Sequence, residues 1–182
     1  IVNLSEGFRL PSMDVSSQGE SKMLKTMRLT AGNWGDPFNT ARLELSDEKY
    51  YRYVSKYSNL LYYNYLPSFA NPSAPGGYSQ RAYDMGMLNF DHDLTILPNE
   101  RFTPYLRIAR NWSDGRGITP LVVQGNEYSL RTNLDWYQQD VAGGIRMNFT
   151  RSHVTIEHGA TDFGDSQSIF STEALRGSRG TT

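Results

Sequence analysis

The sequence contains no cysteine among its 182 residues. This absence excludes disulfide scaffolds, cysteine-ligated zinc and iron–sulfur sites, and thiol catalysis. No apolar run approaches the roughly 18–20 residues that a membrane-spanning helix needs, so a helical membrane protein is excluded too. The chain also lacks a basic excess, with 18 Lys and Arg against 19 Asp and Glu. This balance argues against nucleic-acid binding, and we expect no nucleic-acid partner.

Helix signals and catalytic motifs are equally scarce. No long segment repeats apolar residues at intervals of three and four. The chain has no Gly-x-Ser-x-Gly nucleophile elbow, and the glycines within residues 114–117 lack the Lys-Ser/Thr ending of a phosphate loop. We therefore expect no enzyme activity, no catalytic residues and no cofactor.

The sequence does contain many aromatic residues and many alternating segments. Aromatics make up 13% of the chain, although only 38% of it is hydrophobic. The clearest alternation covers residues 136–149, where Val141, Ile145 and Met147 alternate with polar Arg146 and Asn148. Such a period of two is typical of a β-strand with two unlike faces. A second alternating run follows a three-residue break, which predicts a hairpin.

The same pattern predicts about seven strands, preceded by an N-terminal extension at 1–21. They cover approximately residues 22–30, 40–45, 50–65, 80–94, 101–112, 136–149 and 153–163. The connections alternate in length. Long ones are expected at 31–39, 66–79 and 113–135 and in the loop or tail at 164–182, and short ones at 46–49, 95–100 and 150–152.

Because long and short connections alternate, one end of the sheet has long loops and the other has short turns, as in outer-membrane barrels. Strands that cross hydrocarbon must close into a barrel, because every backbone N–H and C=O needs a partner there. We therefore predict an all-β fold, an antiparallel up-and-down transmembrane β-barrel in a bacterial outer membrane. Bacterial barrels usually have an even number of strands, so seven suggests an incomplete N-terminal portion. A miscounted small barrel of eight strands is the alternative.

The barrel hypothesis assigns residues to two surfaces. The candidate lumen-facing residues are polar, namely Arg107, Asp140, Arg146, Asn148 and Glu157. The candidate lipid-facing or girdle residues are apolar or aromatic, namely Tyr57, Tyr63, Trp112, Tyr137, Ile145, Met147, Phe149, Val154 and Ile156. Aromatic side chains concentrate where strands cross the membrane–water boundary, and lumen charges of mixed sign give little net ion selectivity.

Several stretches of strand and turn resemble a known family. They are Asn64-Tyr65-Leu66-Pro67-Ser68-Phe69-Ala70-Asn71-Pro72, Tyr78-Ser79-Gln80-Arg81-Ala82-Tyr83-Asp84, Phe102-Thr103-Pro104-Tyr105-Leu106, Gly143-Gly144-Ile145-Arg146-Met147-Asn148-Phe149 and His153-Val154-Thr155-Ile156-Glu157-His158-Gly159. Residues 38–170 resemble the amino-terminal half of large outer-membrane barrel proteins of acidobacterial type, which are similar to the porin-like barrels that sheathe multihaem cytochromes. The resemblance implies a passive pore, or a sheath or scaffold for a periplasmic or electron-transfer partner. It transfers no active-site residues, and the chain has no Cys-x-x-Cys-His haem site of its own.

Two other functions remain open at this point. A secreted soluble β-sandwich could bind carbohydrate through loop aromatics such as Trp112 and Trp136. A structural subunit could pair the edges of an unclosed sheet with other chains.

Metal binding is not favoured by residue spacing. In residues 91–93 the two aspartates share one strand face and His92 points to the other. His153 and His158 likewise face opposite sides of a strand, and Asp162 with Asp165 does not match a calcium loop. We therefore predict no metal site, and leave weak calcium binding by outer loops open.

Overall fold

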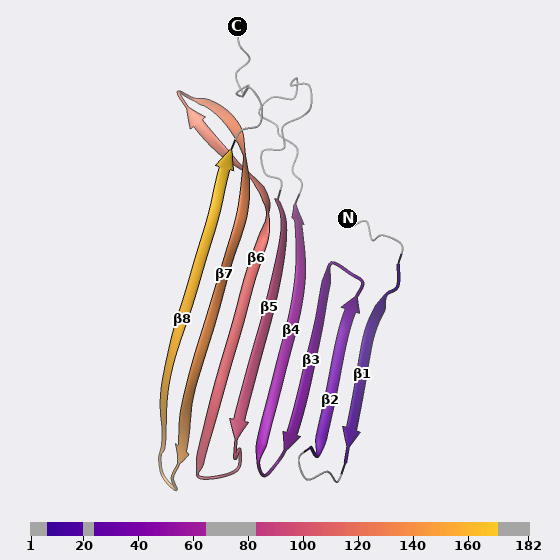
Figure 1. Cartoon of the computed structure of the whole chain (residues 1–182), viewed down its shortest axis with the longest axis vertical. Helices are drawn as coiled ribbons and strands as arrows, with labels where there is room; N and C mark the ends of the chain where they lie inside the picture. Colours follow the sequence, from indigo (N-terminus) through magenta and orange to yellow (C-terminus); the bar gives the residue numbers. More distant parts are fainter. Residues whose placement is uncertain (1–6, 20–23, 65–82, 171–182) are drawn as a thin grey trace. The chain divides into compact units, whose positions relative to one another are not determined.

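A computed structural model describes residues 7–19, 24–64 and 83–170 of the chain (Figure 1). These residues form eight strands and no helix. The strands are β1 (Leu10–Gln18), β2 (Thr26–Trp34), β3 (Phe38–Asp47), β4 (Tyr51–Asn64), β5 (Tyr83–Ile96), β6 (Phe102–Val123), β7 (Asn126–Asn148) and β8 (His153–Phe170). In the part of the chain that the structure describes, no helix is long and apolar enough to cross a membrane.

The eight strands form one sheet in which each strand lies beside its neighbours in the sequence, from β1 to β8. The strand pairs from β1 to β4 are antiparallel, as an up-and-down sheet requires. The predicted all-β, antiparallel up-and-down fold is therefore confirmed. The sheet is open, with β1 and β8 as its end strands, so the closed transmembrane barrel stays a prediction.

The register gives the sheet two unlike faces. Leu29 lies opposite Leu43, and Leu45 lies opposite Tyr53, on what we call the apolar face. Arg42 lies opposite Lys56 on the other side, which we call the polar face. This separation follows from the period of two, because a strand sends successive side chains to opposite sides.

The two faces continue across the later strands. A Cβ on Gly86 would meet the side chain of Asp114 at 3.5 Å, so the even-numbered residues of β5 and β6 share a face. Asn89 of β5 donates to Ser58, which shares the polar face with Lys56 on β4, so the odd-numbered Asp91 and Arg107 belong to the polar face. The guanidinium of Arg146 lies over the Tyr105 ring, which extends the polar face to the even-numbered residues of β7.

Few apolar side chains are buried. Among the described residues only Val54 and Tyr105 qualify, at 8% and 6% exposure. Val54 lies opposite Glu44, and Tyr105 lies in the same strand as Arg107 at an even separation, so both belong to the polar face. The apolar face of the described sheet therefore contributes none of this small core.

The chain divides into two compact units. The first comprises Ile1–Leu60, Leu88–Asn111 and Gln138–Phe163, and the second comprises Leu61–Met87, Trp112–Tyr137 and Gly164–Thr182. The first unit contains the described residues of β1 to β3 and the paired charges described below. The second contains the β6–β7 turn and the last residues of β8.

The structure corrects several predicted boundaries. Residues 10–18 form β1, although we expected an extension there. The predicted loop at 113–135 consists instead of β6 and β7 joined by the tight turn Gln124-Gly125, and β8 continues to Phe170 within the predicted tail. The connection at 31–39 is also shorter than predicted, because β2 ends at Trp34 and β3 begins at Phe38. The predicted long connection at 66–79 lies outside the described residues.

Candidate functional site

Paired charges of both signs cover the polar face of β1 to β3. The guanidinium of Arg28 donates to the Asp14 carboxylate at 2.6 Å. Arg42 forms an ion pair with Glu44, two residues further along the same strand. Because the carboxylates offset the arginines, this part of the face carries little net charge.

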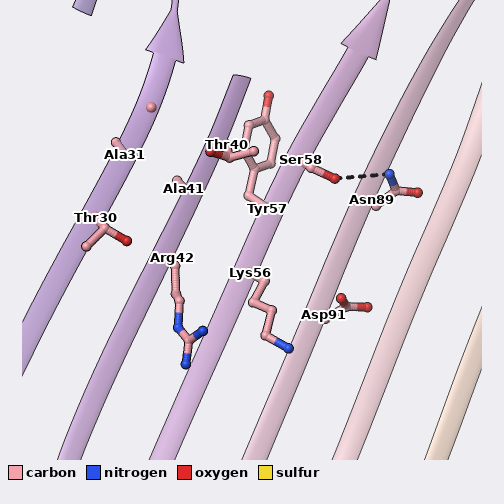
Figure 2. Close-up of a pocket in the computed structure, with 11 residues that line it drawn as sticks. Thr30, Ala31, Thr40, Ala41, Arg42, Lys56, Tyr57, Ser58, Asn89 and Asp91 are labelled. Atoms are coloured by element: carbon pink, nitrogen blue, oxygen red, sulfur yellow. Dashed lines mark hydrogen bonds between the residues drawn. The ribbon is translucent and has the colours of Figure 1, made fainter. Parts of the chain in front are cut away.

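A hollow of about 480 Å³ lies across β2 to β5 (Figure 2). Hydroxyl and amide groups form much of its lining, and Asn89 Nδ2 donates to Ser58 Oγ at 3.1 Å. Arg42 and Lys56 lie along one side and Asp91 projects from the next strand (Figure 2). Ala31, Gly32 and Ala41 add apolar surface to the lining, and its charges are of both signs, so the hollow does not select one class of ligand.

The most tightly connected polar cluster joins β6, β7 and β8. The Glu157 carboxylate accepts from both the Tyr105 hydroxyl and the Arg107 guanidinium. Arg146 lies over the Tyr105 ring, with its guanidinium carbon 4.4 Å from the ring centroid. Gly144 makes room for this ring, because a Cβ there would lie 2.8 Å from the Tyr105 hydroxyl oxygen.

The structure therefore brings together three of the five predicted lumen-facing residues, Arg107, Arg146 and Glu157. Asp140 lies elsewhere on the same strand face as Arg146 and accepts from Gln138 at 2.7 Å and Thr161 at 2.5 Å. The Asn148 backbone N–H donates to the Arg101 carbonyl at 2.9 Å. These residues share the polar face, and whether that face lines a lumen stays a prediction.

Aromatic rings form a continuous row on the apolar face. Trp34 stacks on Tyr57 at 5.8 Å between centroids, and Phe90 meets Tyr57 edge-on at 5.0 Å. His92 stacks on Tyr53 and Phe90, and its Nδ1 lies 2.9 Å from the Tyr53 hydroxyl. Of the residues in this row, only Tyr57 is among the predicted lipid-facing or girdle residues. The others lie on different strands, and the sequence does not show the register that aligns them.

Most of the other predicted lipid-facing residues have exposed side chains. Tyr137, Phe149, Val154 and Ile156 are exposed, the last at 60%. Trp112, Ile145 and Met147 are half-buried, and the side chain of Tyr63 lies outside the described residues. Lipid contact stays a prediction for all of them.

No group of three or more metal-ligating side chains occurs among the described residues. His92 is engaged by Tyr53 and faces away from Asp91. Asp165 accepts instead from Gln167 at 3.2 Å.

Comparison with known proteins adds no relative to this geometry. No family model matches the chain, and no curated protein or solved structure does so either. The resemblance to acidobacterial outer-membrane barrels therefore stays a prediction from sequence. The apolar and polar faces of the sheet are therefore the basis for assigning a function.

Proposed function

We propose that this sheet forms part of the wall of a bacterial outer-membrane β-barrel, with its apolar face toward lipid and its polar face toward an aqueous interior. The observation that carries the proposal is the two-faced single sheet with almost no buried apolar core. A soluble sheet covers its apolar face with a second layer. In the described residues the sheet is the sole layer, and lipid would provide the missing cover.

The length of the apolar band supports this placement. A tilted strand needs about 9–11 residues to cross hydrocarbon. On β7 the apolar-face residues from Val141 to Met147 are aliphatic or glycine, and Phe149 directly after the strand extends this run to nine residues. On β8 Val154 and Ile156 lie on the same face and are followed by His158. Charged groups then follow on this face, with Asp162 on β8 and Arg110 on β6. Every strand of the first unit is long enough for such a crossing.

The polar face supports a passive role. Its arginines and lysine are interspersed with carboxylates, which gives no strong field of one sign. A hydrated solute could move along such a polar surface, and a hydrophilic protein could lie against it. We therefore propose a non-enzymatic pore, or a sheath or scaffold for a periplasmic or electron-transfer partner.

The alternative of a secreted sandwich has less support. A sandwich needs two packed sheets, and the described strands form one. Tyr57, one of the residues that line the hollow, is engaged by Trp34 and Phe90, so its ring is not a free platform for a sugar.

Reconstitution tests the proposal. The full chain, refolded with phospholipid vesicles, should float with them in a density gradient and resist extraction by carbonate at high pH. A chain that stays soluble and monomeric without detergent would overturn it. Vesicle swelling in small neutral sugars then separates the two roles, because a pore gives swelling and a scaffold without an open channel does not.

A further inference from the structure

Two aromatic rings lie where the apolar face ends, beside the short connections that precede β6 and follow β7. Phe102 is the first residue of β6 and Phe149 directly follows β7, and the alternation of these strands puts both on the apolar face. The Asn148 backbone N–H donates to the Arg101 carbonyl at 2.9 Å, which places the end of β7 beside the start of β6 (Figure 1). Phe102 is 47% exposed and Phe149 is 38% exposed, so the rings form an open aromatic surface at this margin.

The side chain of Arg101 lies over both rings. Its guanidinium carbon is 4.5 Å from the ring centroid of Phe149 and 5.8 Å from that of Phe102, and both distances are within cation–π range. Arg101 precedes β6, so the alternation of the strand does not decide its side. The two rings do decide it, because they hold the positive charge at the margin of the apolar face. The arginine itself remains exposed.

The charge of Arg101 has no carboxylate partner. On the polar face Arg28, Arg42 and Arg107 each form an ion pair with an aspartate or glutamate. Among the described residues Arg101 forms none, and its recorded side-chain partners are the two rings. Its guanidinium N–H groups are therefore available to an anion.

A second arginine lies close in the chain to the same rings. Arg151 belongs to the connection 149–152 that begins with Phe149, and it is exposed and forms no ion pair within the described ranges. The connections 97–101 and 149–152 together contain two arginines and one carboxylate, that of Glu100. The margin of the apolar face therefore has an excess of positive charge at this point.

We propose that Arg101 and Arg151, together with the rings of Phe102 and Phe149, bind the headgroup of an anionic phospholipid. The inference rests on the proposed function, because that function places lipid against the apolar face. Aromatic side chains favour the depth at which acyl chains meet headgroups, and a guanidinium matches a phosphate with two parallel hydrogen bonds. A phospholipid fits both parts of the site, since its acyl chain can cover the rings while its phosphate accepts from the arginines. Free phosphate would gain nothing from the rings.

Contact quenching tests the site in the full chain. Thr150→Cys gives a unique thiol beside Phe149 and Arg151, because the sequence has no cysteine, and a bimane fluorophore is attached to it. The labelled chain is reconstituted in phosphatidylcholine vesicles that contain a matched fraction of either phosphatidylglycerol or phosphatidylcholine with a nitroxide near the headgroup. Since each basic residue near a membrane surface favours anionic lipid by about fivefold, we expect the site to prefer phosphatidylglycerol at least about fivefold.

A matched pair of variants locates the effect. Arg101→Gln should lower the preference for phosphatidylglycerol by about fivefold. Arg52→Gln is the control and should leave it unchanged. Arg52 lies near the same end of the sheet but on the polar face, opposite Ser46. Both substitutions remove one positive charge, so they differ only in the face from which it is removed.

The remaining outcomes overturn the inference. An equal loss in both variants would show that overall charge, and not this site, attracts the lipid. A preference that excess inorganic phosphate abolishes at constant ionic strength would make free phosphate the ligand. A chain that floats with neutral vesicles but shows no preference would overturn this site and leave the proposed function intact. A chain that does not float with any vesicle would overturn both.

Discussion

At the scale of single residues, two adjacent glycines of β7 differ sharply in the space around them. A Cβ on Gly144 would lie 2.4 Å from the Ile156 carbonyl oxygen and 2.9 Å from the Tyr105 ring, whereas on Gly143 it would meet nothing closer than 3.7 Å. Gly144→Ala should therefore destabilise the folded state by about 1–3 kcal/mol through overpacking. Urea unfolding followed by tryptophan fluorescence measures the change. Gly143→Ala is the control, and an equal loss in both variants would contradict the geometry.

A second pair of residues tests the two faces. Ile156 lies on the apolar face at 60% exposure, and its neighbour Thr155 lies on the polar face. If the apolar face contacts lipid, Ile156→Arg should lower folding stability in vesicles by about 2 kcal/mol, because an arginine would enter hydrocarbon. Thr155→Arg should change it by less than about 0.5 kcal/mol. Equal effects of the two substitutions would indicate that both faces meet water.

At the scale of elements, the strands that alternate clearly could be predicted, and those with weak patterns could not. The β7–β8 hairpin was predicted because Val141, Ile145 and Met147 alternate with polar residues. The second half of β6 was missed because its glycines and polar residues resemble a loop. Gly115 is needed there for close packing, since a Cβ would lie 2.2 Å from the Asp84 carbonyl oxygen. β1 was missed because it is short and rich in serine.

For the candidate site, the sequence indicated which residues share a face but not which of them are in contact. Alternation alone placed Arg107, Arg146 and Glu157 on one face. The partners that organise the site come from register between strands, as when Tyr105 bonds Glu157 or Trp34 stacks on Tyr57. A single sequence contains little information about register, so these contacts required the structure.

The β6–β7 turn gives a prediction at the same scale. Gln124 and Gly125 have φ values of 50° and 72°, the left-handed backbone of a two-residue hairpin turn. Asn tolerates this backbone better than Gln, so Gln124→Asn should stabilise the hairpin by about 0.5 kcal/mol. Gln124→Val should destabilise it by about 1 kcal/mol, because β-branched residues avoid positive φ. Urea unfolding ranks the three chains, and a reversed order would contradict the turn geometry.

At the scale of the whole molecule, the absence of cysteine becomes an experimental advantage, because any introduced thiol is unique. Nitroxide labels can be placed one at a time at positions 139–148 of β7, leaving out the tightly packed Gly144 and its neighbour Gly143. In vesicles we expect oxygen to relax the labels at Val141, Ile145 and Met147 most strongly, since oxygen concentrates in lipid. A water-soluble nickel chelate should instead relax the labels at Arg146 and Asn148. Such a period of two is the pattern of a sheet with lipid on one side and water on the other. Strong chelate relaxation at every position would show water on both faces, and the sheet would then need a protein partner rather than lipid to cover its apolar side.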